Sequence, residues 1–178
     1  AVERTTIQYG TSFFYPISAV GSHVSAVPNH QTGRITPLET RAVTAMAGSF
    51  GYELDLNTLS DSEKEQVKNQ IVRFKKDGPL IHNGIYYRLS NPMTDKLAAW
   101  EFVSEDRREA LVGGVVFRTE PNSLQYRIKL RGLIPEAKYS LLESGECYTG
   151  SALMSGGVLL PKTWGDYAPI ELHFTAQT

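Results

Sequence analysis

The chain has 178 residues, of which 41% are hydrophobic and 21% charged, as in an ordinary soluble globular protein. Its formal net charge of −1 argues against a nucleic-acid-binding protein, because such proteins carry a clustered positive field. No stretch approaches the roughly 20 apolar residues that a membrane span needs. One cysteine, Cys147, excludes an internal disulfide. We therefore expect a cytoplasmic protein in which Cys147 is a half-buried structural thiol.

Helix and strand signals alternate in the first half of the chain. We expect the tail of a helix over Ala1–Gly10 and then an apolar stretch, Phe13–Val20, that contains a strand. Thr36–Glu39 (TPLE) has the pattern of a capping box with proline at the first helical position, so it predicts a helix start. Phe50–Leu56 (FGYELDL) alternates with period two, which predicts a second strand.

A further helix is predicted from a second capping box, Ser60–Glu63 (SDSE), and its end from Gly78-Pro79. The order helix, strand, helix, strand, helix is typical of β/α units with parallel strands. Two parallel strands cannot bury both faces of a sheet, and parallel sheets are normally covered on both sides. Residues 1–88 therefore look like part of a larger α/β structure.

Short antiparallel strands are predicted in residues 89–178. Apolar side chains such as Ile170, Leu172 and Phe174 alternate with polar ones, as on a strand with one buried face. Turn sequences separate the candidates, and several such strands indicate an antiparallel β-sandwich. The predicted strands are Ala98–Ser104, Ala110–Thr119, Leu124–Arg131, Lys138–Glu143 and Pro169–Ala176.

Gly21–Arg34 (GSHVSAVPNHQTGR) is a polar loop that follows the first predicted strand, a position where binding groups concentrate. A sugar needs several directional donors and acceptors at fixed positions, so the loop supplies candidate substrate-binding residues. The alternative is that the same side chains hydrogen-bond one another and the loop backbone. No cysteine or carboxylate separates the two histidines, which argues against a metal site. The candidates are Ser22, His23, Asn29, His30 and Arg34.

Glu53 and Asp55 are the one obvious pair of carboxylates. Two residues apart on a strand, they would point to the same side, whereas a glycosidase places its two carboxylates on either side of the scissile bond. We therefore expect them to cap backbone groups or to pair with basic residues. Trp100 and Trp164 could each stack on a sugar ring, although a tryptophan within a strand, as Trp100 is, usually belongs to the core.

Five stretches of the chain resemble the α-galactosidases of glycoside hydrolase family 36, above all the bacterial ones. They are IQYGTS (7–12), GSHVSAVPNHQTGR (21–34), TPLETR (36–41), GYELDL (51–56) and AWEFVSED (99–106). The resemblance implies a TIM barrel, a (β/α)8 fold, followed by a small C-terminal β-sandwich. Residues 1–88 would then supply the last helices and strands of the barrel, and residues 89–178 the antiparallel β-sandwich.

The resemblance also implies a function. The family cleaves terminal α-galactosyl residues of melibiose- and raffinose-type sugars with retention, using one aspartate as nucleophile and another as acid/base. The nucleophile's Lys-Trp-Asp motif is absent from the chain. The acid/base motif normally runs into Ala-Val-Glu-Arg, which here is Ala1–Arg4. We therefore expect both aspartates to lie upstream, no catalytic residue within the chain, and no activity from the chain alone.

The family needs no metal or organic cofactor, and its members are often tetramers, so the resemblance implies a cofactor-free homo-oligomer that binds α-galactosides. A different class of function stays open: a non-catalytic carbohydrate-binding or oligomerisation module with the sandwich as its working part. A narrower alternative is galactosyl transfer, as in plant raffinose synthases. An upstream sequence that contains Lys-Trp-Asp and then Ser-Asp-Asn-Thr-Asp would favour the hydrolase.

Overall fold

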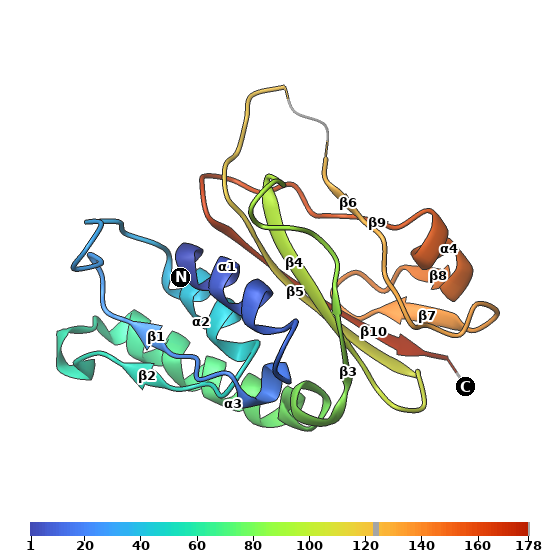
Figure 1. The fold of residues 1–178 in the computed structure, drawn as a ribbon, viewed down its shortest axis with the longest axis horizontal. Coiled ribbons are helices and arrows are strands. Elements are labelled where there is room, and N and C mark those ends of the chain that lie inside the picture. The colour runs from blue at the N-terminus through green and yellow to red at the C-terminus, as the bar shows by residue number, and fades with distance from the viewer. Residues whose placement is uncertain (123–124, 178) are drawn as a thin grey trace.

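Helices gather on one side of a long, twisted antiparallel sheet in the computed structural model, which describes residues 1–122 and 125–177 (Figure 1). Three helices come first in the chain and pack on one face of the sheet, whereas a short fourth helix lies on the opposite side. No described helix is both long and apolar enough to cross a membrane. The helices are α1 (Val2–Thr11), α2 (Leu38–Met46), α3 (Asp61–Asn83) and α4 (Gly150–Ser155).

The main sheet has six strands in the order β3-β4-β5-β10-β7-β8, and each neighbouring pair is antiparallel. A two-stranded antiparallel sheet, β6 (Arg127–Ile128) with β9 (Val158–Leu159), lies over one of its faces. A separate two-stranded parallel sheet pairs β1 (Val24–Ser25) with β2 (Tyr52–Glu53) beside the helices. The main sheet consists of β3 (Ile85–Arg88), β4 (Leu97–Val103), β5 (Glu109–Val116), β7 (Lys138–Leu141), β8 (Cys147–Thr149) and β10 (Ala168–Ala176).

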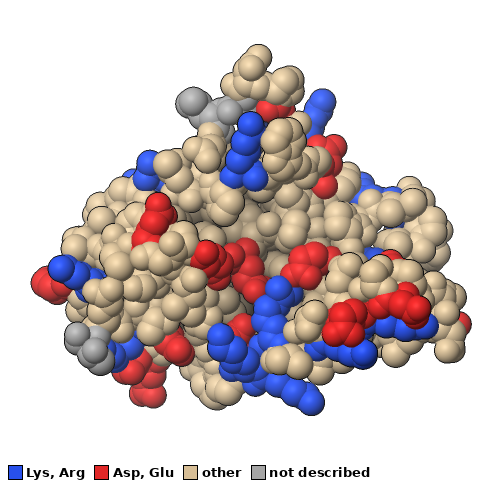
Figure 2. All heavy atoms as spheres, turned by 180° about the vertical axis from the view of Figure 1, so that it is seen from behind, with Lys and Arg blue, Asp and Glu red and all other residues tan. Residues whose placement is uncertain are grey.

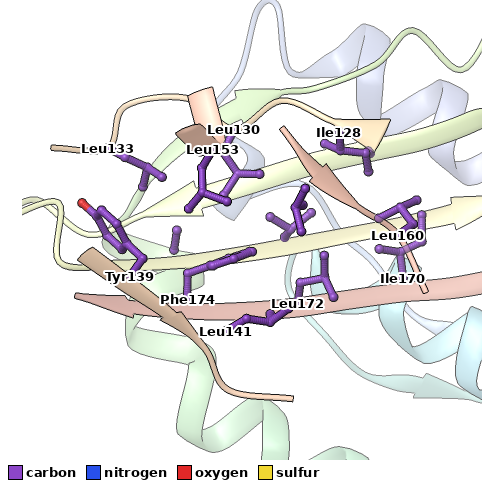
Figure 3. Close-up of a cluster of buried hydrophobic side chains, with 14 of the residues drawn as sticks. Ile128, Leu130, Leu133, Tyr139, Leu141, Leu153, Leu160, Ile170, Leu172 and Phe174 are labelled. Atoms are coloured by element: carbon purple, nitrogen blue, oxygen red, sulfur yellow. The ribbon is translucent and has the colours of Figure 1, made fainter. Parts of the chain in front are cut away.

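One hydrophobic core, the sandwich core, fills the space between the main sheet and the layer formed by β6, β9 and α4 (Figure 3). Strand β10 supplies Ile170, Leu172 and Phe174 to it, and the residues between them are only half-buried. This is the predicted alternation, because successive side chains of a strand point to opposite faces. The covering layer supplies Leu130 and Leu153, so the prediction of an antiparallel sandwich in this part of the chain is confirmed.

A second core, the helical core, lies between the helices and the other face of the same sheet. Residues of α2 and α3 meet Ala98, Trp100 and Phe102 of β4 there, and Trp100 is only 5% exposed, which confirms its predicted core position. All seven residues of β4 are buried, because its side chains enter the two cores in turn. The helical core therefore contains residues from both predicted segments, 1–88 and 89–178.

A partly buried ion pair also joins α3 to the sheet. Arg73 of α3 lies 3.3 Å from Glu171 of β10 and pairs with Glu39 of α2. Burial raises the pKa of Glu171 to about 7, and the Arg73 guanidinium opposes that rise. Figure 2 shows Lys and Arg side chains lying beside Asp and Glu side chains across one face of the described molecule, as the net charge near zero leads one to expect.

The predicted helix over Ala1–Gly10 is confirmed as α1, but Phe13–Val20 contains a short 3-10 turn (Ile17–Ala19) where we expected a strand. Pro16 has no N–H to donate to a sheet, and the aromatic residues before it are exposed, so nothing there favours strand pairing. The strand comes later, at β1. It pairs with β2 in parallel, as predicted, over Val24–Tyr52 and Ser25–Glu53.

The second predicted strand, Phe50–Leu56, is reduced to Tyr52–Glu53. Strand β1, its partner, is two residues long, so pairing ends there. Asp55 then starts a 3-10 turn, and its side chain accepts a hydrogen bond from the Asn57 backbone N–H at 2.9 Å. The period-two pattern thus indicated the right place for a strand but not its length.

Helix α3 starts at the predicted capping box but does not end at Gly78-Pro79. Ser60 and Glu63 exchange both capping hydrogen bonds, and the helix continues to Asn83. Gly78 has no Cβ that could collide with the Pro79 ring, so the residue before the proline keeps its helical conformation. The box predicted at Thr36–Glu39 is wrong: Pro37 precedes α2 without a side-chain cap.

Strands β4, β5, β7 and β10 lie within the predicted ranges or extend one residue beyond them. The predicted strand Leu124–Arg131 contains only β6, and Leu124 itself lies outside the described residues. Strands β3, β8 and β9 and helix α4 were not predicted. Cys147 is exposed rather than half-buried, because β8 lies at the edge of the main sheet.

Candidate functional site

Ser22 lies in the interior, only 4% exposed, just before β1. Its hydroxyl accepts a hydrogen bond from Gln8 Nε2 at 3.0 Å, and the same amide donates to the carbonyl of Thr44 at 3.0 Å. Gln8 of α1 thereby ties the start of the loop to α2. The hydroxyl of Ser22 links the loop to the helices.

His23 joins β1, β2 and α1 through one imidazole ring. Its Nε2 lies 2.7 Å from a carboxylate oxygen of Glu53, and Nη2 of Arg4 lies 3.0 Å from the same Nε2 and 3.4 Å from Nδ1. Burial lowers the pKa of His23, the Arg4 guanidinium lowers it further, and Glu53 opposes both. A neutral ring protonated at Nε2 can donate to Glu53, and Nδ1 is then the ring atom that can accept from Arg4, at the longer of the two distances.

His23 and Glu53 lie on the face of the β1–β2 pair that points away from the helical core, and His23 contacts Arg4 of α1 there. Val24 and Tyr52, the residues next to them, contribute to the helical core, and successive strand residues point to opposite sides. The Glu53 side chain is 74% exposed. The face opposite the helical core is therefore polar and presents the exposed carboxylate of Glu53. Glu53 pairs with a basic residue and Asp55 caps a turn, as predicted for the two carboxylates.

Asn29 closes the tip of the loop on itself. Its Oδ1 accepts hydrogen bonds from the backbone N–H groups of Gln31 at 3.1 Å and Thr32 at 3.0 Å. The backbone N–H of Asn29 donates to the carbonyl of Arg34 at 2.9 Å, so residues 29–34 form a closed turn. This is the structural role of a side chain that shapes a loop. His30 lies exposed at the tip of the turn.

Arg34 connects the closed turn to two other segments. It forms an ion pair with Glu3 of α1, and its guanidinium lies 5.5 Å from the ring centre of Tyr167, just before β10. A small hollow beside it is lined by Ser25, Asn29 and Arg41 among others. Arginine donors and an asparagine amide around one hollow are groups that a sugar hydroxyl can use.

The structure brings two of the five predicted residues, His23 and Arg34, to the first turn of α1, whereas Ser22 contacts Gln8 further along that helix. Arg4 contacts His23, and Glu3 contacts Arg34. Glu3, Arg4, Arg41 and Tyr167 were missed by sequence reasoning, since their partners lie 16 or more residues away and leave no local pattern. Among the described residues, no group of histidine, cysteine and carboxylate side chains could hold a metal ion.

Comparison with known proteins places both halves of the chain in one family. Residues 1–84 match the melibiase family model, and residues 97–174 match the model of the glycosyl hydrolase family 36 C-terminal domain. The bifunctional α-galactosidase/sucrose kinase AgaSK of Mediterraneibacter gnavus is 54% identical over 98% of the chain. α-Galactosidase AgaA of Geobacillus stearothermophilus is 47% identical over 94% of the chain.

Solved structures agree with these matches. The galactosidase domain of AgaSK superposes with a TM-score of 0.97 at 53% identity over 99% of the chain. A variant of AgaA from Geobacillus stearothermophilus in complex with raffinose gives a TM-score of 0.95 at 44% identity over 99% of the chain. The chain belongs to glycoside hydrolase family 36, whose characterised members matched here are α-galactosidases. It spans 19% of AgaSK, 23% of AgaA and 24% of either solved structure.

Proposed function

We propose that the chain is the C-terminal portion of a retaining α-galactosidase that hydrolyses terminal α-galactosyl residues of melibiose- and raffinose-type sugars. The observation that carries the proposal is the 54% identity to an α-galactosidase over 98% of the chain. The relative solved with raffinose supports the substrate class. Residues 1–88 would be the last β/α units of a TIM barrel, and the parallel pairing of β1 with β2 supports this. Residues 89–178 would be the sandwich domain.

In this proposal the five predicted residues shape the rim of the sugar pocket. Arg34 supplies donors to sugar hydroxyls, His23 holds the Glu53 carboxylate beside them, Asn29 fixes the turn, Ser22 anchors the start of the loop and His30 lies at its tip. The polar face of the β1–β2 pair would line the barrel interior. The two catalytic aspartates belong to the upstream part of the protein, so the chain alone does not turn over substrate.

The test compares two proteins on a chromogenic α-galactoside: the chain alone, and the chain joined to its natural upstream sequence. We expect turnover only from the longer protein, with Lys-Trp-Asp and Ser-Asp-Asn-Thr-Asp motifs upstream. Clear activity of the chain alone, free of host enzyme, would show that the catalytic groups lie within the chain and would contradict the proposal. Retention is checked by following the anomer released first. Transfer of galactose to a second sugar in place of water would favour a galactosyltransferase.

The full protein is proposed to be a cytoplasmic homo-oligomer, a tetramer by analogy with the family, that works without metal or organic cofactor. Light scattering on the full protein measures its mass directly. Treatment with a chelator tests the cofactor, because unchanged turnover after removal of divalent metals is the expected result.

A second candidate, a non-catalytic carbohydrate-binding module, is favoured by one observation. Trp164 is 81% exposed and lines a hollow with Tyr126, Asn122 and Gln125, and also with the charged Glu120 and Lys162. The ammonium of Lys162 lies 4.8 Å from the centre of the Trp164 ring. An aromatic face beside polar groups suits a sugar ring. Titration of the chain with raffinose separates the two functions: binding that is lost in Trp164→Ala would favour the module, and no binding would favour the hydrolase fragment.

A further inference from the structure

Tyr167 has a backbone conformation that a bulky residue rarely adopts. Its φ is +59°, in the left-handed region, where a side chain with a Cβ is disfavoured. It lies at the end of the connection between β9 and β10, where the chain enters β10 at Ala168. Strain of this kind persists only where the surrounding structure holds the residue in place.

Contacts from three other segments hold Tyr167. The hydroxyl of Thr40, a fully buried residue of α2, donates to the carbonyl of Tyr167 at 2.5 Å. The backbone N–H of Tyr167 points to the carbonyl of Phe117 at 3.4 Å, just after β5. The ring lies under the guanidinium of Arg34 at 5.5 Å, a distance at which cation and ring attract. The strained backbone therefore presents its ring to the loop after β1.

Arg34 is the residue through which that ring can act on the loop. Residues 29–34 close on themselves through their own hydrogen bonds, so the turn behaves as one small body. Its last residue, Arg34, carries the contacts to Glu3 and Tyr167. With its guanidinium between a carboxylate and an aromatic face, Arg34 has one orientation that satisfies both.

We propose that Tyr167 is a positioning residue: its strained backbone sets the orientation of Arg34 and thereby of the turn 29–34. The sandwich part of the chain then determines the geometry of a loop that the first part carries. The consequence for sugar binding rests on the proposed function, whereas the contact itself does not.

The test measures hydrogen exchange of the turn's backbone amides in two matched variants. Tyr167→Asn removes the ring and introduces a residue that tolerates a left-handed backbone. Tyr167→Phe keeps the ring. We expect exchange of the amides of Gln31, Thr32 and Gly33 to speed up about two- to fivefold in Tyr167→Asn, the factor that a cation–π contact at an exposed site corresponds to. In Tyr167→Phe, exchange stays at the wild-type rate.

The Arg34→Ala variant tests whether the faster exchange depends on Arg34. In Arg34→Ala the turn has lost its contact with the ring, so adding Tyr167→Asn produces no further acceleration. The proposal is overturned if exchange in Tyr167→Asn equals the wild type, or if the acceleration is as large in the Arg34→Ala background. Because exchange and not sugar cleavage is measured, the result does not depend on whether the parent protein is an α-galactosidase.

Discussion

The carboxylate of Glu101 is fully buried on β4, where its side chain points to the sandwich core. One oxygen accepts a hydrogen bond from the backbone N–H of Arg131 at 2.8 Å, and the other has no partner among the described residues. Burial raises the pKa of Glu101 to about 8, and the hydrogen bond from Arg131 opposes the rise only in part. The folded protein therefore holds Glu101 in its protonated form near neutral pH.

Stability should depend on pH through this residue. The pKa is 4.5 without the protein environment and about 8 in the fold, so between these values the folded state binds the proton that the unfolded state has lost. The free energy of unfolding then falls by up to about 1.4 kcal/mol for each unit of rising pH. Glu101→Gln keeps an acceptor for the backbone N–H of Arg131 and removes the titratable carboxyl group. The free energy of unfolding of the variant, relative to the wild type, should therefore rise from pH 5.5 to 8.5.

Denaturant unfolding of both proteins at the two pH values measures this effect. Glu105→Gln, a change at an exposed position of the next turn, is the control and leaves the pH dependence unaltered. If Glu101→Gln and the wild type lose stability in parallel as the pH rises, the buried carboxyl is not the source of the pH dependence.

Contacts between single residues were the least predictable part of the site. Asn29 was predicted as a sugar-binding residue, with hydrogen bonds to its own loop backbone as the alternative, and those backbone hydrogen bonds are present. The contacts of His23 with Arg4 and Glu53 join residues 19 and 30 positions apart, which only the tertiary fold brings together. For the same reason Tyr167, 133 positions after Arg34, left no signal in the sequence.

Helix α3 contains a proline within its last two turns. Pro79 is exposed, and it removes one hydrogen bond from a helix that continues to Asn83. The turn beyond it persists because Leu80 and Ile81 are buried in the helical core. Tertiary burial thus outweighs the local preference to end the helix at the proline.

Replacing this proline should strengthen the helix. Pro79→Ala restores a backbone donor, and we expect the free energy of unfolding to rise by about 1–2 kcal/mol, since the helical gain exceeds the entropy returned to the unfolded chain. Gly78→Ala with Pro79 retained is the matched opposite: its new Cβ meets the proline ring and lowers stability. Thermal unfolding of the two variants should shift in opposite directions, and a shift in the same direction would contradict this account.

At the scale of elements, the sequence was reliable where one local rule acts without a competitor. Ser60 and Glu63 form the predicted capping box on an exposed helix end, where the further side-chain contact of Ser60, with Ser62, stays within the same turn. The similar pattern at Thr36 fails because Glu39 turns to Arg73 and Gln70 of α3. A partner on another helix is not visible in the motif, so the motif alone could not distinguish the two cases.

The molecule as a whole leaves apolar side chains uncovered on its helical side. Phe13, Phe14 and Tyr15 follow α1 and are all exposed, Phe14 by 84%. Ile7 and Ile35 are also more than half exposed. Large apolar side chains exposed in this number commonly mark a contact with another part of the protein or with another chain. This exposed surface agrees with the prediction that residues 1–88 are part of a larger α/β structure.

We expect the chain on its own to associate through this surface. Light scattering should give a mass above the 19.8 kDa of one chain, and the double variant Phe14→Ser with Tyr15→Ser should shift it toward one chain. Trp164→Ser, which removes an equally exposed aromatic from the sandwich side, is the control and leaves the mass unchanged. A monodisperse monomer of the unmodified chain would contradict the prediction.

Fold class was predictable at this scale because it depends on periodicity, which many residues share. The alternation along β10 and the helix starts were enough to separate a helical first part from a β-rich second part. The sequence could not show that both parts use the two faces of one sheet. An uninterrupted apolar strand such as β4 has the same pattern whether one core or two receive its side chains.

Strand β4 has no side that faces water, and this restricts how the protein can change over time. On a strand with one face in water, every second residue can be replaced by another polar residue without loss of the fold. Along residues 97–103 each replacement must suit one of two crowded interiors, and Gly113 of β5 already leaves no space beside Trp100 for even a methyl group. Evolutionary novelty in this part of the molecule is therefore confined to its turns and connections, among them the one that carries Tyr167.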